Sequence, residues 1–220
     1  MRPSLRSRER GVALIAVLWV VLLLSVIAGS LLLLTRSDLD LSRNLVLSSR
    51  AESLAEGGIY LGTLALLDPD PETRWVPDGR SYRMVRESGT LDVSLQDETG
   101  RIDLNGAPPE LLSSLLASAG VEAEQVDILA NRIIDWRDPD DETRPNGAEQ
   151  DDYDAAGLEI RVGNRPFMTA DEVQRVPGVT SELYARIAPA VTVYSGRPGI
   201  NPGTAPRAAL LALPGTDEAT

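Results

Sequence analysis

The longest apolar stretch of the chain lies near its start, at residues 12–34. It contains no charged side chain, and its 23 residues, at about 1.5 Å per residue in an α-helix, span the roughly 30 Å core of a bilayer. Four arginines precede it, at Arg2, Arg6, Arg8 and Arg10. Because basic flanks stay in the cytoplasm, the pattern predicts one membrane-spanning helix with the remaining chain outside. The alternative is a cleaved secretory signal peptide, whose apolar core is about 7–15 residues long.

A helical pattern continues beyond this stretch. Small and apolar residues recur at three- and four-residue steps or their multiples, at Leu41, Leu45, Ser48, Ala55, Ile59, Gly62 and Leu66. No proline interrupts the pattern before Pro69, where an Asp-Pro-Asp-Pro run ends it. We therefore predict one helix of about 50 residues, half in the membrane and half packed through this face on a globular head. The alternative is a membrane anchor followed by a separate amphipathic helix.

Residues 80–104 change to the two-residue period of β-strands. Apolar and polar side chains alternate over 82–86 and again over 91–96, and a turn sequence containing glycine follows each run. These signals predict a small antiparallel sheet. Residues 101–104 are expected to form its next strand.

From Asn105 onward the chain has a helical pattern with an internal repeat. Two apolar residues three apart, followed by glycine, occur at 116–121, 173–179 and 210–215. Each occurrence predicts two helices joined by a glycine in the left-handed conformation. These units resemble helix-hairpin-helix and SAM-like modules, which in DNA repair proteins present backbone amides to phosphate. The expected fold class is α+β, with a long N-terminal helix, a small antiparallel sheet and an α-helical domain.

Composition and charge restrict what these units can do. The chain has no cysteine and no histidine, which excludes disulfide bonds, zinc fingers and histidine-based catalysis. Removing residues 1–11, which carry four arginines and one glutamate, changes the net charge from −12 to −15. Such an acidic body repels nucleic acid and attracts cations. We therefore expect the hairpins to serve packing, with no nucleic-acid partner.

The most acidic part of the chain lies between the first two hairpins. Nine carboxylates fall within residues 135–154, where their repulsion requires either a bound cation or full solvation. Six residues have the spacing of the ligands in an EF-hand calcium loop, namely Asp138, Asp140, Glu142, Arg144, Asn146 and Glu149. Thr143 replaces the usual glycine, so a true EF-hand is not expected, but oxygen ligands without His or Cys favour calcium. The alternative is a solvated, disordered linker, against which the aromatic Trp136 and Tyr153 argue.

The junction between the basic leader and the apolar stretch carries a family resemblance. Arg10-Gly11-Val12, followed by Ala-Leu-Ile-Ala-Val-Leu, resembles the processing site of type IV prepilins and type II secretion pseudopilins. The resemblance implies that a prepilin peptidase cuts between Gly11 and Val12, leaving Val12 as an N-methylated terminus. Most members have glutamate where this chain has Ala16. Its absence is typical of one minor pseudopilin, general secretion pathway protein K.

The acidic segment and its flanks resemble the same family. The motifs Asp-Trp-x-Asp-x-Asp, Gly-Ala-Glu, Asn-Arg-Pro-Phe and Glu-Val-x-x-Val-x-Gly-Val are similar to protein K sequences, from about Gly100 to Leu213. The family implies a pilin-like head interrupted by a helical domain, bound calcium, and a position at the pseudopilus tip with minor pseudopilins I and J. By this resemblance the calcium ligands are expected to be Asp138, Asp140, Glu149 and Asp152, with Asp135 and Asp154 in reserve.

Together these patterns predict both an organisation and a function. The expected regions are a cleaved cytoplasmic leader, a transmembrane helix, a pilin-like helix and sheet, a helical domain with the acidic loop, and a truncated further hairpin, at 1–11, 12–34, 35–104, 105–200 and 201–220. The expected function is that of a non-enzymatic minor pseudopilin in the bacterial inner membrane, with a periplasmic body. Its expected partners are prepilin peptidase, the membrane and the I and J pseudopilins. The alternatives are a minor pilin of a type IV or DNA-uptake pilus and a membrane-anchored, metal-dependent hydrolase.

Overall fold

The computed structural model describes residues 8–87 and 89–213, without the side chains of residues 8–12 and 31–40. The chain divides into two compact units, one formed by Met1–Ile59 with Val85–Leu91 and the other by Tyr60–Met84 with Asp92–Thr220. Each unit is described by itself. The second unit contains the acidic segment and most of the buried side chains.

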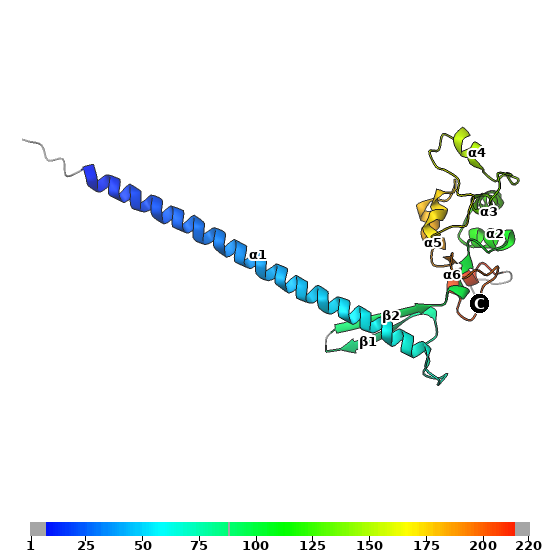
Figure 1. Cartoon of the computed structure of the whole chain (residues 1–220), viewed down its shortest axis with the longest axis horizontal. Helices are drawn as coiled ribbons and strands as arrows, with labels where there is room; N and C mark the ends of the chain where they lie inside the picture. Colours follow the sequence, from blue (N-terminus) through cyan, green and yellow to red (C-terminus); the bar gives the residue numbers. More distant parts are fainter. Residues whose placement is uncertain (1–7, 88, 214–220) are drawn as a thin grey trace, which may run out of the picture. The chain divides into compact units, whose positions relative to one another are not determined.

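Helix α1 (Arg8–Leu66) runs without a break through the predicted membrane stretch and beyond it (Figure 1). This confirms the prediction of one long helix rather than an anchor with a separate amphipathic helix. The window Ala13–Ser30 is long and apolar enough to cross a membrane, with a mean hydropathy of 2.6 and no part of it buried within the protein. The chain turns at Asp68, whose carboxylate accepts hydrogen bonds from the backbone N–H of Asp70 (3.0 Å) and the hydroxyl of Thr73 (2.9 Å).

Strands β1 (Asp78–Arg86) and β2 (Gly89–Gln96) form the predicted hairpin. Gly62 of α1 lies against β2, because a Cβ atom added there would come within 3.1 Å of the Leu95 side chain. Gly62 is the only buried member of the predicted packing face, and Ile59, for example, is 69% exposed. The rest of that face was predicted wrongly, because apolar residues occur on every side of α1 and their spacing does not select the packed side.

The prediction that residues 101–104 form a third strand of the hairpin sheet is wrong. Residues Ile102–Asp103 form strand β3, which pairs in parallel with β4 (Val191–Thr192) in a separate two-stranded sheet. Ile102 and Leu104 are fully buried, so this segment belongs to the core of the helical part. The local pattern suggested that this segment continues the hairpin sheet. Burying Ile102 and Leu104 in the helical part is more favourable than that pairing.

The buried carboxylate of Asp103 fastens this small sheet to the turn after β4. It is 1% exposed and accepts hydrogen bonds from the backbone N–H groups of Asn105 (2.8 Å) and Gly196 (2.6 Å). It also accepts one from the hydroxyl of Ser195 at 3.1 Å and one from the backbone N–H of Gly106 at 3.2 Å. A buried carboxylate satisfied in this way holds two distant parts of the chain together.

The remaining described chain is mainly helical. Its helices are the 3₁₀ helix η2 (Glu98–Gly100), α2 (Pro109–Ser118), α3 (Ala123–Arg137), α4 (Gln150–Ala155), the 3₁₀ helix η3 (Ala170–Arg175), α5 (Ser181–Ile187) and α6 (Arg207–Leu210). Helices α2 and α3 pack together (Figure 1) and are joined through Gly120, which has a φ of +81°. Gly178 joins η3 to α5 with a φ of +97°. Both angles confirm the predicted left-handed glycines, whereas Gly215 of the third predicted turn lies outside the described residues.

Both flanks of the acidic segment are anchored in the core. The ring of Trp136, at the end of α3, lies 6.1 Å from that of Phe167 and 6.2 Å from that of Tyr153, measured between centroids. Asn105 holds the backbone of Phe167 through two hydrogen bonds, of 3.0 Å to its C=O and 2.7 Å from its N–H. The segment is therefore part of a packed fold, which contradicts the alternative of a disordered linker.

Candidate cation-binding site in the acidic loop

The acidic loop, residues 138–149, folds back onto the last turn of α3 through Asp135. This side chain is 0% exposed, and its Oδ2 accepts hydrogen bonds from the backbone N–H of Arg144 (3.2 Å) and of Ala148 (3.0 Å). Any side chain at Gly147 would overlap the same carboxylate, so only glycine fits there. Asp135, expected only as a reserve ligand, is thus central to the loop.

Asp135 and Asp138 share one positive charge. Nε of Arg144 lies 3.3 Å from Oδ1 of Asp135, and Nη2 of Arg144 lies 3.4 Å from Oδ2 of Asp138. Burial raises the pKa of both carboxyl groups, in each case aided by a neighbouring aspartate, even though Arg144 opposes the shift. The arginine therefore offsets only part of the cost of holding these two charges together.

Glu149 has no such compensation. It is 3% exposed, and neither of its carboxylate oxygens has a hydrogen-bond partner among the described residues. Burial raises the pKa of Glu149 to about 7, and the charges of Asp135, Asp138, Asp141 and Asp140 add to the shift in that order. Glu149 is therefore a buried carboxylate near four other acidic groups, with no donor to compensate its negative charge.

Two further aspartates border the cluster without joining it. Oδ1 of Asp140 accepts a hydrogen bond from the backbone N–H of Glu142 (3.0 Å). Oδ1 of Asp141 accepts one from Nδ2 of Asn164 (2.7 Å), which leaves Oδ1 of Asn164 buried without a partner. Asn164 also has a φ of +42°. It was not predicted as a site residue, although it opens the Asn-Arg-Pro-Phe motif and asparagine tolerates left-handed backbone.

The other two expected ligands have structural partners on α4. Oδ2 of Asp152 accepts a hydrogen bond from the backbone N–H of Glu149 (3.0 Å), at the start of that helix. Oδ1 of Asp154 accepts one from Nε2 of Gln150 (2.8 Å). In the part of the chain that the structure describes, no three acidic side chains stand close enough to hold a metal ion as they are. A cation would have to draw Asp135, Asp138 and Glu149 together.

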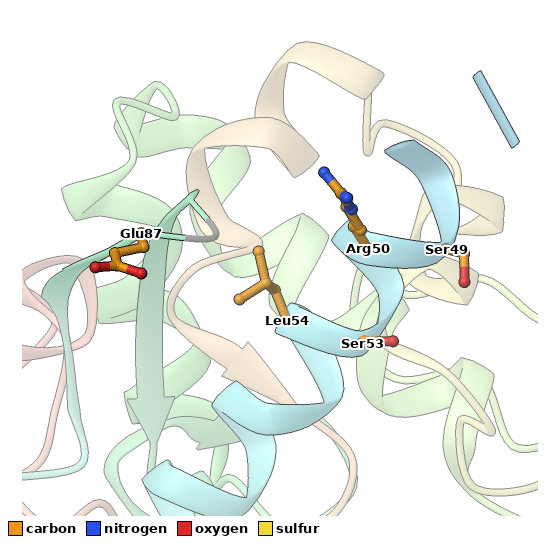
Figure 2. Close-up of a pocket in the computed structure, with 5 residues that line it drawn as sticks. All are labelled: Ser49, Arg50, Ser53, Leu54 and Glu87. Atoms are coloured by element: carbon orange, nitrogen blue, oxygen red, sulfur yellow. The ribbon is translucent and has the colours of Figure 1, made fainter. Parts of the chain in front are cut away.

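The chain has a hollow beside α1. It measures about 630 Å³ and is lined by Ser49, Arg50, Ser53, Leu54 and Glu87. Figure 2 shows Glu87 on the hairpin and the other four side chains on α1, with no two polar groups meeting. A catalytic site needs a nucleophile within hydrogen-bond reach of a base, and this hollow does not provide one.

The predicted processing residues, Gly11 and Val12, are part of helix α1. The structure does not describe their side chains. The structure thus combines a long helix, whose apolar window fits a membrane anchor, with a small hairpin and a helical part that carries the acidic loop. The model of the family "Type II secretion system (T2SS), protein K" matches residues 93–196, which include the acidic loop. Residues 93–196 are therefore a protein K domain, the family that the sequence motifs indicated.

Curated proteins similar to this chain are named type II secretion system protein K. Type II secretion system protein K of Pseudomonas aeruginosa is 28% identical over 232 residues, which cover 95% of this chain and 69% of the relative. The Klebsiella pneumoniae protein is 25% identical, covering 94% and 71%. The putative protein K of Escherichia coli K12 is 23% identical, covering 86% and 64%. The chain thus spans about two thirds of the length of these relatives.

A solved structure shares the fold. It is the crystal structure of the GspK-GspI-GspJ complex from enterotoxigenic Escherichia coli, of which one chain matches with a TM-score of 0.54 at 24% identity. The match covers 81% of this chain and 68% of that chain. It supports a pseudopilin-like fold of mixed helices and small sheets.

Proposed function

We propose that this chain is a minor pseudopilin of a type II secretion system and acts as a non-enzymatic subunit at the tip of the periplasmic pseudopilus. The observation that carries the proposal is the protein K family match over residues 93–196, on a chain with one membrane-spanning helix candidate. Its partners are then the I and J minor pseudopilins, since the solved relative is a complex of GspK with GspI and GspJ.

Ala16 supports the position at the tip. In pilin-type filaments the family's glutamate is expected to meet the terminal amine of the subunit above it. A tip subunit has no subunit above it, so a carboxylate at this place would stay unpaired in lipid, at a cost of about 2.5–3.5 kcal/mol. An uncharged residue at position 16 avoids that cost in a capping subunit.

Affinity capture from bacterial membranes tests this function. The full chain, tagged at its C-terminus, is expressed together with the I, J and repeating pseudopilins of its own secretion system. We expect I and J to be captured in equal amounts with it, and the repeating pseudopilin only in traces. Capture of the repeating pseudopilin alone, or immunogold labelling along the whole filament, would contradict the tip position.

We also propose that the leader is removed on the cytoplasmic side of the inner membrane. Prepilin peptidase would cut between Gly11 and Val12, methylate Val12, and leave the rest of the chain as a periplasmic body on a single-pass anchor. The basic residues before the apolar stretch support this orientation. Protease added to intact spheroplasts should digest the body, and protection of the body would contradict the periplasmic orientation.

The helical part is proposed to consist of packing units rather than nucleic-acid-binding hairpins. We assign α2–α3 and η3–α5 to the helix-hairpin-helix, SAM-like class. A Cβ atom on Gly178 would come within 2.6 Å of Leu129 on α3, so this turn is occupied by protein contacts. Unchanged mobility of DNA in gel-shift assays with the full chain is the expected result.

We propose, finally, that the acidic loop binds calcium. Asp135, Asp138, Glu149 and Asn164 each have a buried oxygen without a hydrogen-bond partner, and a set of oxygens alone suits a hard cation. Bound calcium supplies two positive charges that offset the repulsion among the carboxylates. Asp152 would act indirectly, by holding the backbone of Glu149.

Thermal unfolding of the full chain in detergent, in CaCl₂ and in EGTA, tests this site. A ligand that binds only the folded state at a hundredfold excess over Kd stabilises it by about 2.7 kcal/mol. We expect a higher melting temperature in CaCl₂, and no such difference in Asp138→Ala. Asp151→Ala is the matched control, since Asp151 is an exposed acid of the same segment and should keep the difference. Identical melting of the unaltered chain in both buffers would refute calcium binding.

A further inference from the structure

The acidic loop contains a cation of its own, the guanidinium of Arg144. It lies between the carboxylates of Asp135 and Asp138, at 3.3 and 3.4 Å. No other basic side chain in the described ranges forms an ion pair with either aspartate. Each contact joins a different nitrogen to a different carboxylate, so neither carboxylate has the two-point pairing that makes arginine–carboxylate contacts strong.

The neighbouring arginines are not available for this role. Arg137 donates hydrogen bonds to the backbone C=O groups of Leu104 and Ala107, so its guanidinium is directed at the core. Arg132 donates to the C=O of Pro177 at 3.0 Å. Arg144 is the one whose side chain is 45% exposed, and it can therefore turn into solvent without leaving buried donors unsatisfied.

The oxygens around Arg144 are more numerous than it can satisfy. Buried oxygens of Asp138, Glu149 and Asn164 have no hydrogen-bond donor, and Oδ1 of Asp135 has only its 3.3 Å ion pair with Arg144. Glu149 makes no ion pair with any described residue. Glu149 is the independent sign of a ligand, because it is 3% exposed and both of its carboxylate oxygens are unpartnered. A single guanidinium with planar, fixed donors cannot reach all of these oxygens.

We propose that Arg144 is a resident counter-ion, which stabilises the calcium-free loop and competes with calcium for Asp135 and Asp138. The inference rests on the proposed calcium site. When calcium binds, Arg144 leaves the two aspartates for solvent, and its positive charge no longer occupies the centre of the loop. Arg144 thereby lowers the affinity for calcium and keeps the loop folded when calcium is scarce.

Calorimetric titration of the full chain in detergent with CaCl₂ tests this competition. Arg144→Gln should bind calcium about fivefold more tightly, since removing two partly exposed ion pairs removes a competing interaction of that order. The same variant should melt at a lower temperature than the unaltered chain in EGTA. Arg165→Gln is the matched control, because Arg165 also pairs with a buried acid, Glu172 at 2.7 Å, and its side chain is 47% exposed. It should not change the calcium affinity.

The outcomes separate this inference from the calcium site itself. If the unaltered chain binds calcium and Arg144→Gln binds it equally or more weakly, the competition is refuted while the calcium site stands. If neither binds calcium, both are refuted. Should Arg144→Gln fail to fold by circular dichroism, Arg144→Lys decides. A lysine ammonium is a single point charge and does not reproduce the two separate nitrogen contacts of the guanidinium, so tighter calcium binding supports the competition and unchanged binding refutes it.

Discussion

Replacing Glu149 by glutamine should have opposite effects on stability with and without calcium. The carboxyl group of Glu149 has a pKa of about 7 against an ordinary value of 4.5. Because the folded state holds this proton more tightly than the unfolded state, the calcium-free fold loses stability as pH rises from about 4.5 to about 7. At 1.36 kcal/mol per pKa unit, the pKa difference between the folded and unfolded states corresponds to a loss of about 3 kcal/mol in the free energy of unfolding above pH 7. Glutamine is never charged and avoids this loss.

The assay is urea unfolding of the full chain in detergent, followed by tryptophan fluorescence at pH 4 and at pH 8. In EGTA at pH 8 we expect Glu149→Gln to be more stable than the unaltered chain by up to about 3 kcal/mol. At pH 4 the two should be equal, because Glu149 is then protonated in both the folded and the unfolded chain. In CaCl₂ at pH 8 only the unaltered chain should gain stability. A variant that is less stable in EGTA at pH 8 would show that Glu149 is not an uncompensated charge.

Three further predictions concern other parts of the molecule. Asp103→Ala should lower the free energy of unfolding by about 3–5 kcal/mol in urea titrations, since it leaves buried donors unsatisfied, whereas Ser195→Ala should cost much less. Gly147→Ala should displace the Asp135 carboxylate and abolish calcium heat in calorimetry, while Gly199→Ala, which meets nothing within 4 Å and has no positive φ, should preserve it. Gly11→Arg should leave the leader uncut in membranes containing prepilin peptidase, and Gly11→Ala should be cut, as read by mass spectrometry; an uncut native chain would contradict the processing site.

Local patterns along the chain were sufficient for several parts of this structure. The end of α1 before Pro69, the β1–β2 hairpin and the left-handed Gly120 and Gly178 were all predicted correctly. Each depends on neighbours within a few residues, through the missing N–H of proline, the two-residue period of strands or the lack of a Cβ in glycine. The crowding of carboxylates in 135–154 likewise indicated where a cation site should be sought.

The sequence by itself thus determined the long apolar helix, the main elements and the acidic segment. Only the tertiary structure decided which residues of that segment meet. Asp135 and Asn164 reach the loop from two sides, Asp152 turns to the backbone of Glu149, and β3 pairs with a strand almost ninety residues away. Periodicity records which side of an element is apolar, but it does not record what packs there. Contacts between distant segments depend on how buried side chains and buried charges are satisfied together, and that balance exists only in the folded chain.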